Sequence, residues 1–515
     1  MALKKTTVEQ LAHHIITFYN EYDLRVSGRI NNLTAFQLIE TIEKQFDTDA
    51  IMLPDGTKLW NLVRVFLYSN FQSLGEQASS KKSRMSAWKP VLSIIKESLQ
   101  PLRLQRQIPV CGFSSSESRK LYNDTYYDIY LDPLYEILGD RLTVFEWPET
   151  TGARRDYDRP IYSRHYVPMH IPITTKAFWT LLLHQLTGRR TYTIQGEQTL
   201  KNILMFISTT ASVDNERLTT DIYDFFTVFF SIKQFLSSVL QHVRPRVVLI
   251  RCGYGRFPMA LSQACRELRI PSIELQHGLI TAYLPAYRRT TPTTNQDCIP
   301  EYLLAQGDIY ASLVREGNLF DPNKVISTGY PYLEKKLGEK HENRKLKQSF
   351  SRFPRNLLFT SQWIVAKEIQ EFVVSVADLL EQQKLDVGIL FKPHPYDRTD
   401  YTQMQRHDHL IPVDKYEDTF KLFALADLHS TVYSTSGLEA MAFAVPNIFV
   451  DIYKLTKGTN TSYIVSTPEE FVTSIRTILS SYEASSRETK AVADLFFTPS
   501  PNQRFTDFFR TMGLL

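Results

Sequence analysis

Residues 247–278 read VVLIRCGYGRFPMALSQACRELRIPSIELQHG, and this stretch decides the fold. It opens with an aliphatic run, passes through two glycines into an amphipathic segment, and closes on a second apolar run, PSIEL. Short apolar runs that alternate with helices of about 10 to 15 residues are typical of parallel βαβ units. The stretch therefore predicts an α/β domain built on a parallel sheet.

The same alternation continues on both sides of this stretch. Before it lie the apolar runs IPVCGF and LTVFEW, and after it EYLLAQ and KVIST. A charged segment follows, and then a second series with the runs RNLLFT, DVGILF, LHSTVY and VPNIFV. The predicted organisation is a helical N-terminal region 1–106, a Rossmann-like domain 107–337, a linker 338–353, a second Rossmann-like domain 354–490 and a tail helix 491–515.

Length and composition agree with an ordinary globular protein of at least two domains. The chain has 515 residues, of which 43% are hydrophobic and 22% charged. Its formal net charge of +4 is too small to indicate nucleic acid as a partner. The four cysteines, Cys111, Cys252, Cys265 and Cys298, form no CxxC pair, which favours a reducing compartment.

The N-terminal segment MALKKTTVEQLAHHIITFYN lacks the apolar core of a signal peptide. The most apolar stretch of the chain, 225–240, is interrupted by Lys233 and Gln234. It is shorter than the roughly 20 residues that span a bilayer. We expect a buried helix there, the alternative being a helix on a membrane surface, and a cytoplasmic location for the protein.

A histidine between two prolines follows the apolar run DVGILF of the second domain. The motif is Lys392-Pro393-His394-Pro395, and its prolines restrict the local backbone. A histidine held at the carboxyl end of a strand can donate a hydrogen bond to a phosphate oxygen, and Lys392 adds positive charge. The alternative is a proline-stiffened turn with a solvated histidine.

A run of hydroxyl residues, Ser434, Thr435 and Ser436, ends the next predicted strand and leads into a helix expected to begin at Gly437. A helix N-terminus presents unpaired N–H groups and the positive end of its dipole, so this turn predicts a phosphate site. Glu439 stands one turn into the helix, where a carboxylate can hydrogen-bond a ribose. Ser436 and Glu439 also match the S-x-x-E capping box, which is the structural alternative.

Together, the segments KPHP and STSGLEAM resemble motifs of glycosyltransferases with two Rossmann domains, the GT-B architecture. The resemblance is strongest to the bacterial branch with a His-Pro motif, which includes capsule-type sialic-acid and Kdo transferases and the glycerophosphotransferases of teichoic-acid synthesis. It implies that His394 and the Ser434–Ser436 turn contact the phosphate of a nucleotide donor and that Glu439 holds its ribose. It implies a CMP-, CDP- or UDP-linked substrate and no separate cofactor.

Two residues of the first domain are candidates for the catalytic base. His277, in Glu274-Leu275-Gln276-His277-Gly278, ends a strand at a glycine that permits a tight turn. It is expected to act as a base toward an acceptor hydroxyl or to steady the leaving phosphate, unless backbone groups satisfy it. Glu117, after the serines at 114–116, is the rival base, although a helix-capping role is favoured for it.

Two further patterns are weak. Gly253 and Gly255 form a single GxG that lacks the third glycine and the acidic residue of a dinucleotide site. Asp156 and Asp158 form a DxD, but Arg154 and Arg155 precede them, so ion pairs are expected there and no metal site.

These features predict a metal-independent GT-B-type transferase. It would move a sugar or a polyol phosphate from a nucleotide donor to a saccharide or lipid-linked acceptor in surface polysaccharide synthesis. A peripheral contact with the inner face of the membrane or with a polysaccharide-assembly complex is compatible with this prediction. Two alternatives stay open: a sugar-nucleotide epimerase of the same architecture, and a non-catalytic scaffold of such a complex.

Overall fold

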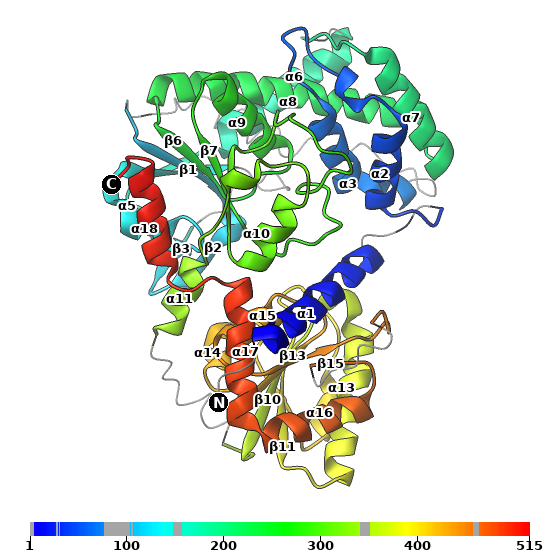
Figure 1. Cartoon of the computed structure of the whole chain (residues 1–515), viewed down its shortest axis with the longest axis vertical. Coiled ribbons are helices and arrows are strands. Elements are labelled where there is room, and N and C mark those ends of the chain that lie inside the picture. The colour runs from blue at the N-terminus through cyan, green and yellow to red at the C-terminus, as the bar shows by residue number, and fades with distance from the viewer. Residues whose placement is uncertain are drawn as a thin grey trace. The chain divides into compact units, whose positions relative to one another are not determined.

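The computed structural model describes residues 5–26, 31–76, 107–147, 157–188, 192–339, 351–456 and 463–515, together with Arg29, Leu104 and Arg190. The chain divides into two compact units (Figure 1). Unit 1 comprises Met1–Arg25, Gly307–Ile309 and Leu333–Pro499, and unit 2 comprises Val26–Gln306, Tyr310–Tyr332 and Ser500–Leu515. Each unit contains a parallel sheet with helices, so the predicted pair of α/β domains is confirmed.

The described part of unit 2 contains a seven-stranded sheet in the order β5-β4-β1-β6-β7-β8-β9, with every neighbouring pair parallel. Its strands are β1 (Val110–Ser115), β4 (Leu142–Trp147), β5 (Tyr166–Pro168), β6 (Val247–Ile250), β7 (Ser272–Leu275), β8 (Tyr302–Ala305) and β9 (Val325–Ser327). An antiparallel hairpin, β2 (Arg119–Tyr122) and β3 (Thr125–Asp128), follows β1. Without the hairpin, the strand order is that of a Rossmann fold, and it reverses direction between β1 and β6.

Both faces of this sheet are covered, which explains why its strands are apolar throughout. Val110 packs in a cluster with side chains of α5 (Asp132–Leu138) and α18 (Pro501–Thr511). The next residue, Cys111, packs in a cluster with side chains of α3 (Trp60–Glu76), α8 (Asn215–Val243) and α9 (Arg256–Glu267). This alternation is the period of two expected for a strand, and Figure 1 shows the helices on the two sides.

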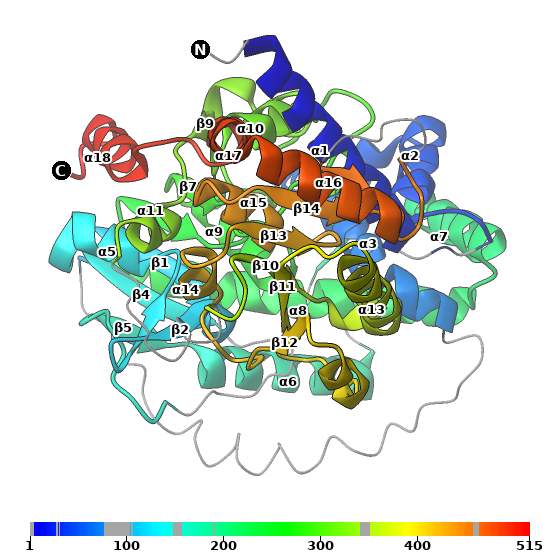
Figure 2. The ribbon, with the colours of Figure 1, turned by 90° about the horizontal axis from the view of Figure 1, so that it is seen from below.

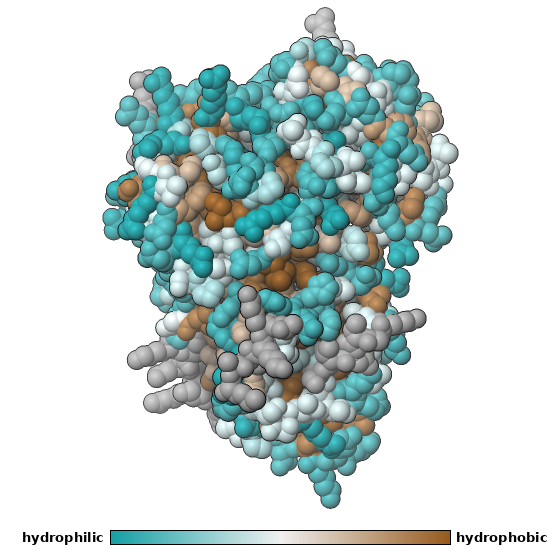
Figure 3. All heavy atoms as spheres, in the orientation of Figure 1, coloured by the Kyte–Doolittle hydropathy of each residue, from teal (hydrophilic) through white to brown (hydrophobic). Residues whose placement is uncertain are grey.

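Three further helices of unit 2 also add to the apolar cluster over α8. They are α2 (Ala35–Gln45), α6 (His170–Thr187) and α7 (Glu197–Ala211). Helix α10 (Asp308–Arg315) begins in unit 1 and continues in unit 2. The predicted buried helix at 225–240 is confirmed, because it forms the largely buried middle of α8. Across the ranges that the structure describes, no helix combines the length and apolar character needed to span a membrane. On the face drawn in Figure 3, hydrophobic residues form small patches among hydrophilic ones.

The described part of unit 1 contains a six-stranded parallel sheet in the order β12-β11-β10-β13-β14-β15. Its strands are β10 (Arg355–Thr360), β11 (Val387–Lys392), β12 (Leu410–Pro412), β13 (Leu428–Thr431), β14 (Asn447–Val450) and β15 (Ile464–Val465). This too is the Rossmann order, and it reverses between β10 and β13. The short strands β12 and β15 were not predicted. The two turns predicted to bind phosphate therefore follow β11 and β13, which flank β10 and are not successive strands of the chain.

The helices of unit 1 alternate with these strands. They are α11 (Pro331–Leu337), which begins in unit 2, α13 (Ala366–Gln382), α14 (Thr419–Phe423), α15 (Ser436–Ala442), α16 (Pro468–Ser480) and α17 (Tyr482–Phe496). The helix start predicted at Thr467 is confirmed as a capping box. The Thr467 hydroxyl accepts from the Glu470 N–H, and the Glu470 carboxylate accepts from the Thr467 N–H, each at 3.2 Å.

The first helix, α1 (Lys5–Val26), lies in unit 1 and not with the other N-terminal helices. The rings of Phe18 and Tyr19 each lie 5.6 Å from the ring of Phe449 on β14, and the Tyr22 ring lies 4.2 Å from that of Tyr433. Figures 1 and 2 both show α1 running across unit 1. The contacts therefore divide the chain differently from the predicted region 1–106, because the apolar face of α1 finds its partner in the last sheet.

The C-terminal tail is also divided between the units. The predicted tail helix 491–515 consists of the end of α17, in unit 1, and the separate helix α18, in unit 2.

Candidate active site

The first site residues of unit 1 lie where β11 ends. Lys392 is 6% exposed, and its ammonium donates a hydrogen bond to the Lys415 carbonyl at 2.9 Å. It therefore already holds the neighbouring loop, and its contact with a phosphate stays a prediction.

His394 follows two residues later and is partly exposed. Its Nδ1 accepts a hydrogen bond from the Tyr396 N–H at 3.1 Å. A neutral ring that accepts at Nδ1 carries its proton on Nε2. The local turn thus gives His394 the tautomer that can donate a hydrogen bond to a phosphate oxygen.

The hydroxyl turn after β13 leads into α15, which begins at Ser436, one residue before the predicted start. Thr435 is the N-cap, and no side chain caps the helix, so the suggested capping box between Ser436 and Glu439 is wrong. The Ser436 N–H instead donates to the Ser434 hydroxyl at 3.2 Å. The turn thus forms a hydrogen bond within itself. Glu439 does not form the capping box with Ser436 that was the alternative to ribose binding.

Ser436 is attached to a buried chain of polar groups that crosses three adjacent strands. Its hydroxyl lies 2.9 Å from the hydroxyl of Thr360, which lies 3.0 Å from Nε2 of His429. Nδ1 of His429 lies 2.6 Å from Oδ1 of Asn447. Burial lowers the pKa of His429 to about 3, so its ring is neutral. A neutral ring has one N–H, and with that proton on Nδ1 it donates to Asn447 and accepts from Thr360.

Close packing at Gly437 holds the helix start against the same strands. A Cβ at this position would lie 2.6 Å from Cε1 of Phe449 and 3.0 Å from Nδ2 of Asn447. Glycine is therefore needed for the approach of α15 to β14. Thr360 and His429 were not predicted as parts of the site, because neither stands in the motifs that follow the strands.

In unit 2, His277 lies two residues beyond β7 on a turn that side chains hold in place. The Gln276 carboxamide donates to the Gly278 carbonyl at 2.7 Å and accepts from the Gln306 N–H at 2.7 Å. The Tyr130 hydroxyl donates to the His277 carbonyl at 2.5 Å. Neighbours after β3 and β8 thus hold both sides of this turn.

Burial lowers the pKa of His277 to about 3, and the charge of Arg251 acts in the same direction. Its Nε2 lies 3.4 Å from the Tyr254 hydroxyl, and its buried Nδ1 has no hydrogen-bond partner among the described residues. The ring is therefore neutral and able to accept a proton. A pKa this low makes it a weak base until an anionic substrate comes close, because a nearby negative charge favours the protonated form.

Glu117 lies in a short 3-10 helix, Ser116–Ser118, which has no side-chain cap, so the favoured capping role is wrong. Its carboxylate lies 3.5 Å from Nη1 of Arg251, and its side chain is half exposed. Arg251, which directly follows β6, was not predicted as a site residue. A charged residue after the aliphatic run VVLI was the signal in the sequence that could have indicated it.

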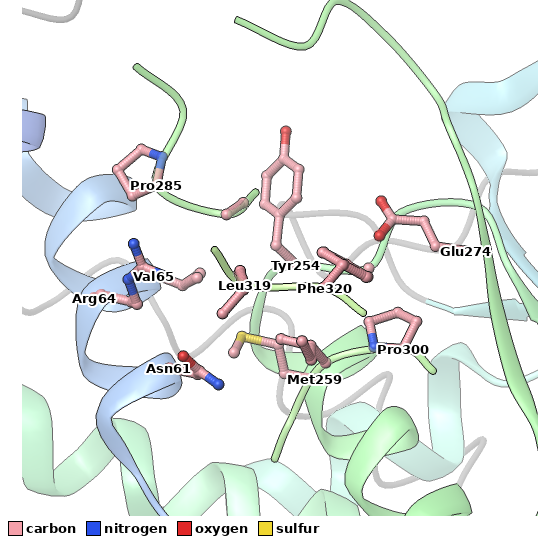
Figure 4. A pocket seen from close by; sticks show the side chains of 13 residues that line it. Asn61, Arg64, Val65, Tyr254, Met259, Glu274, Pro285, Pro300, Leu319 and Phe320 are labelled. Carbon is pink, nitrogen blue, oxygen red and sulfur yellow. The ribbon is translucent and has the colours of Figure 1, made fainter. Parts of the chain in front are cut away.

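A small cavity in unit 2 is lined by Tyr254 and Glu274, among other residues (Figure 4). Its volume is about 10 Å³, room for about one water molecule. Glu274 stands at one wall and accepts from the Tyr287 hydroxyl at 2.6 Å, and burial raises the pKa of Glu274 to about 7. A Cβ on Gly253 would lie 2.2 Å from its carboxylate. Gly253 therefore serves the packing of Glu274, and this cavity is too small to be a substrate site.

The remaining candidates carry no site chemistry in the described residues. Asp158 accepts from the Tyr126 hydroxyl at 2.8 Å, whereas Asp156, Arg154 and Arg155 lie outside the described residues. Within the described ranges, no group of three or more His, Cys, Asp or Glu residues is placed to hold a metal ion. The four cysteines are free thiols.

The two Rossmann-like sheets give the chain a GT-B-like fold. The sequence of residues 275–500 matches the model of the family described as CDP-Glycerol:Poly(glycerophosphate) glycerophosphotransferase. This match confirms the resemblance inferred from the motifs and supports a transferase.

Several solved structures have a similar fold at low sequence identity. A putative UDP-N-acetylglucosamine 2-epimerase from Listeria monocytogenes is 12% identical, with 79% of this chain and 98% of that chain covered and a TM-score of 0.48. UDP-GlcNAc 2-epimerase from Neisseria meningitidis is 12% identical, with 79% and 100% covered and a TM-score of 0.44. The wall teichoic acid polymerase TagF is 13% identical, with 79% and 89% covered and a TM-score of 0.44. A comparison with curated proteins gives no match.

Proposed function

We propose that this protein transfers a polyol phosphate, of the glycerol phosphate type, from a CDP-activated donor to a saccharide or lipid-linked acceptor in surface polysaccharide synthesis. The family match carries this proposal, because it spans residues 275–500 and so includes His277, His394 and the turn from Ser434 to Glu439. Because the family description names CDP-glycerol, we propose the CDP-linked donor among the predicted CMP-, CDP- and UDP-linked substrates.

In such a transfer the acceptor hydroxyl oxygen attacks the phosphorus that carries the polyol. A new P–O bond forms, the bond to the bridging oxygen breaks, and CMP leaves. Negative charge grows on the leaving phosphate. The Nε2–H of His394 and the hydroxyls of Ser434 and Thr435 are the donors that stabilise it. Glu439 holds the ribose of the nucleotide.

The proton of the attacking hydroxyl passes to His277 in this proposal. The ring is neutral, and the approach of phosphate groups raises its pKa toward the range in which a base is effective. Glu117 is less suited to the role, because its carboxylate is already paired with Arg251.

Side-chain donors at the phosphate site take the place that a divalent cation has in other transferases, so we propose a metal-independent reaction. We also propose a cytoplasmic enzyme that meets the inner face of the membrane peripherally, because a lipid-linked acceptor is presented there.

The test is a transfer assay with purified protein, CDP-glycerol and a glycerol-phosphate-primed acceptor, with release of CMP as the readout. Acceptor-dependent CMP release from CDP-glycerol, and not from a CMP-linked acid sugar or a UDP-sugar, is the expected result. It should persist in EDTA. Loss of activity in EDTA that magnesium or manganese restores would contradict metal independence and direct attention to Asp156 and Asp158.

A thermal-shift screen with CMP, CDP, UDP and GDP separates the two alternatives. An epimerase would bind UDP best and convert a UDP-sugar without any acceptor. A scaffold would bind none of the four nucleotides, and either result would refute the transferase proposal.

A further inference from the structure

The sheet of unit 2 has a reversal point with no assigned ligand. In open parallel sheets, ligands bind outside the carboxyl ends of the strands where the strand order reverses. Here the order reverses between β1 and β6, which are paired as far as Phe113 and Ile250. Arg251 directly follows β6, and its N–H donates to the Phe113 carbonyl at 3.0 Å. Its side chain therefore starts at the place where this fold binds ligands.

The guanidinium of Arg251 reaches from β6 to the end of β1. Its Nη1 donates to the Ser115 hydroxyl at 2.6 Å and lies 3.5 Å from the Glu117 carboxylate. Its Cζ lies 5.7 Å from the centre of the Tyr130 ring, and the Tyr130 hydroxyl donates to the His277 carbonyl. One tyrosine thus links the guanidinium to the turn that carries the proposed base.

Polar groups around Arg251 are not fully used within the described part of the fold. Nε of Arg251 and Nδ1 of His277 are buried there without a hydrogen-bond partner. A guanidinium has five N–H donors, whereas this one makes a hydrogen bond to Ser115 and an ion pair with the half-exposed Glu117. Native proteins satisfy buried polar groups almost everywhere, so the unpaired Nε–H of Arg251 indicates a missing acceptor.

We propose that Arg251 and Ser115 form an anion site that binds a phosphate group of the transfer substrates beside His277, the proposed catalytic base. The inference rests on the proposed function, because a transferase of polyol phosphates handles phosphate on both of its substrates. A planar guanidinium binds phosphate through two parallel hydrogen bonds, which a lysine cannot reproduce. In the absence of substrate, Glu117 acts as the counter-ion that the phosphate displaces.

The phosphate can come from either of two sources, the acceptor chain or the group being transferred. Both have the same chemistry, but they differ in the kinetic constant that the site controls. If the phosphate belongs to the acceptor, loss of Arg251 raises KM for the acceptor. If it belongs to the transferred group, loss of Arg251 lowers kcat and leaves KM for the acceptor unchanged.

The direct test is binding of sn-glycerol 3-phosphate to the full chain, measured by calorimetry without nucleotide, together with the steady-state kinetics of transfer. Arg251→Gln should weaken binding or lower kcat/KM at least tenfold, and Arg251→Lys should restore only part of the loss. Glu117→Gln removes the competing carboxylate, so it should tighten glycerol phosphate binding several-fold. Arg266→Gln is the matched control, because Arg266 also pairs with one carboxylate in unit 2, that of Asp297 at 3.9 Å.

Arg251→Gln should weaken glycerol phosphate binding and Glu117→Gln should tighten it. The proposal can therefore be tested even if Arg251→Gln folds poorly. Parental binding and kinetics in Arg251→Gln would overturn it, and so would weaker binding in Glu117→Gln or an equal loss in Arg266→Gln. Binding of CDP reports on the proposed function separately. If the parent protein binds CDP and catalyses transfer, and Arg251→Gln has the same kinetic constants as the parent, only the anion site is refuted. If the parent protein binds no nucleotide, the proposed function is refuted.

Discussion

At the scale of single residues, His429 has no contact with solvent, yet it determines how the helix start at Ser436 is presented. It joins Asn447 on β14 to Thr360 on β10, and Thr360 in turn contacts Ser436. Because the neutral ring has one N–H, one of its nitrogens donates a hydrogen bond and the other accepts one. With the proton on Nδ1, the Ser436 hydroxyl donates inward to Thr360, so Ser434 and Thr435 are the hydroxyls left to face a phosphate.

His429 should also make the folded state sensitive to acid. Its ordinary pKa is about 6.5 in an unfolded chain, and burial lowers the folded value to about 3. Below pH 6.5 the unfolded chain therefore binds a proton that the folded chain does not. The free energy of unfolding falls as the pH decreases from about 6.5 toward 3, by at most about 1.36 kcal/mol per pH unit for this residue.

We therefore predict that His429→Gln flattens the loss of stability between pH 7 and pH 5. Thermal melts of parent and variant at several pH values measure the difference. His407→Gln, on the same unit but paired with Asp378 at the surface, is the control. Parallel curves for the parent and His429→Gln would show that the buried ring is not the source of the acid sensitivity.

His394 should contribute to nucleotide affinity, because its Nε2–H is placed to donate to a charged oxygen. A hydrogen bond to a charged group is worth about 1.5–3 kcal/mol, and about 1.4 kcal/mol is a factor of ten in Kd. His394→Ala should therefore weaken CDP binding at least tenfold, measured by calorimetry, whereas His407→Ala should not. An unchanged Kd in His394→Ala would leave the histidine as part of a proline-stiffened turn only.

At the scale of elements, α1 supports the hydroxyl turn from outside the sheet. The Tyr19 hydroxyl donates to the Ser434 carbonyl at 2.7 Å. One turn further on, the Tyr22 hydroxyl is buried and has no hydrogen-bond partner among the described residues, although its ring packs on Tyr433 and Tyr453. The two tyrosines lie on one face of the helix, but among the described residues only the Tyr19 hydroxyl has a hydrogen-bond partner.

This difference predicts opposite effects of the same substitution. Tyr19→Phe removes a hydrogen bond and should cost about 0.5–1.5 kcal/mol of stability. Tyr22→Phe removes a buried polar group without a partner, so it should be neutral or stabilising. Denaturation of the two variants measures this, and binding of CDP should weaken only in Tyr19→Phe, which touches the turn. A destabilised Tyr22→Phe would show that its hydroxyl has a partner.

Local sequence patterns predicted most of these elements but few of the contacts between them. Runs such as VVLI and GILF indicated strands, and the Thr467–Glu470 spacing indicated a helix start, because each is decided by neighbours in the chain. Arg251 meets Ser115 across 136 residues, and Thr360 meets His429 across 69. No local periodicity records which side chains of different strands meet, so the anion site and the buried histidine chain could be found only in the folded molecule.

At the scale of the whole molecule, the chain does not build its units one after the other. Helix α1 is part of unit 1, and the chain then forms most of unit 2. It returns to unit 1 to form the six-stranded sheet and ends with α18 in unit 2. A division at the predicted linker 338–353 would therefore separate the second sheet from the helix that covers part of it.

This arrangement predicts the behaviour of a fragment. Residues 333–499 alone should melt at a lower temperature than the same residues joined to 5–26 by a flexible linker, because Phe18, Tyr19 and Tyr22 are almost completely buried in the full chain. Truncation of a large buried aromatic side chain costs about 3–5 kcal/mol, and each kcal/mol shifts Tm by about 2–4 °C at this size. The gap should exceed roughly 10 °C; coincident melting curves would mean that α1 is dispensable.

The position of α1 also has a consequence for synthesis in the cell. Tyr19 leaves the ribosome 415 residues before its partner Ser434. At about 5–20 residues per second, this helix waits roughly 20–80 seconds for the strands that will bury it. Throughout that interval its aromatic stripe has no native surface to pack against. Helix α1 must therefore be among the last elements to assemble, and until then its aromatic stripe is open to a chaperone.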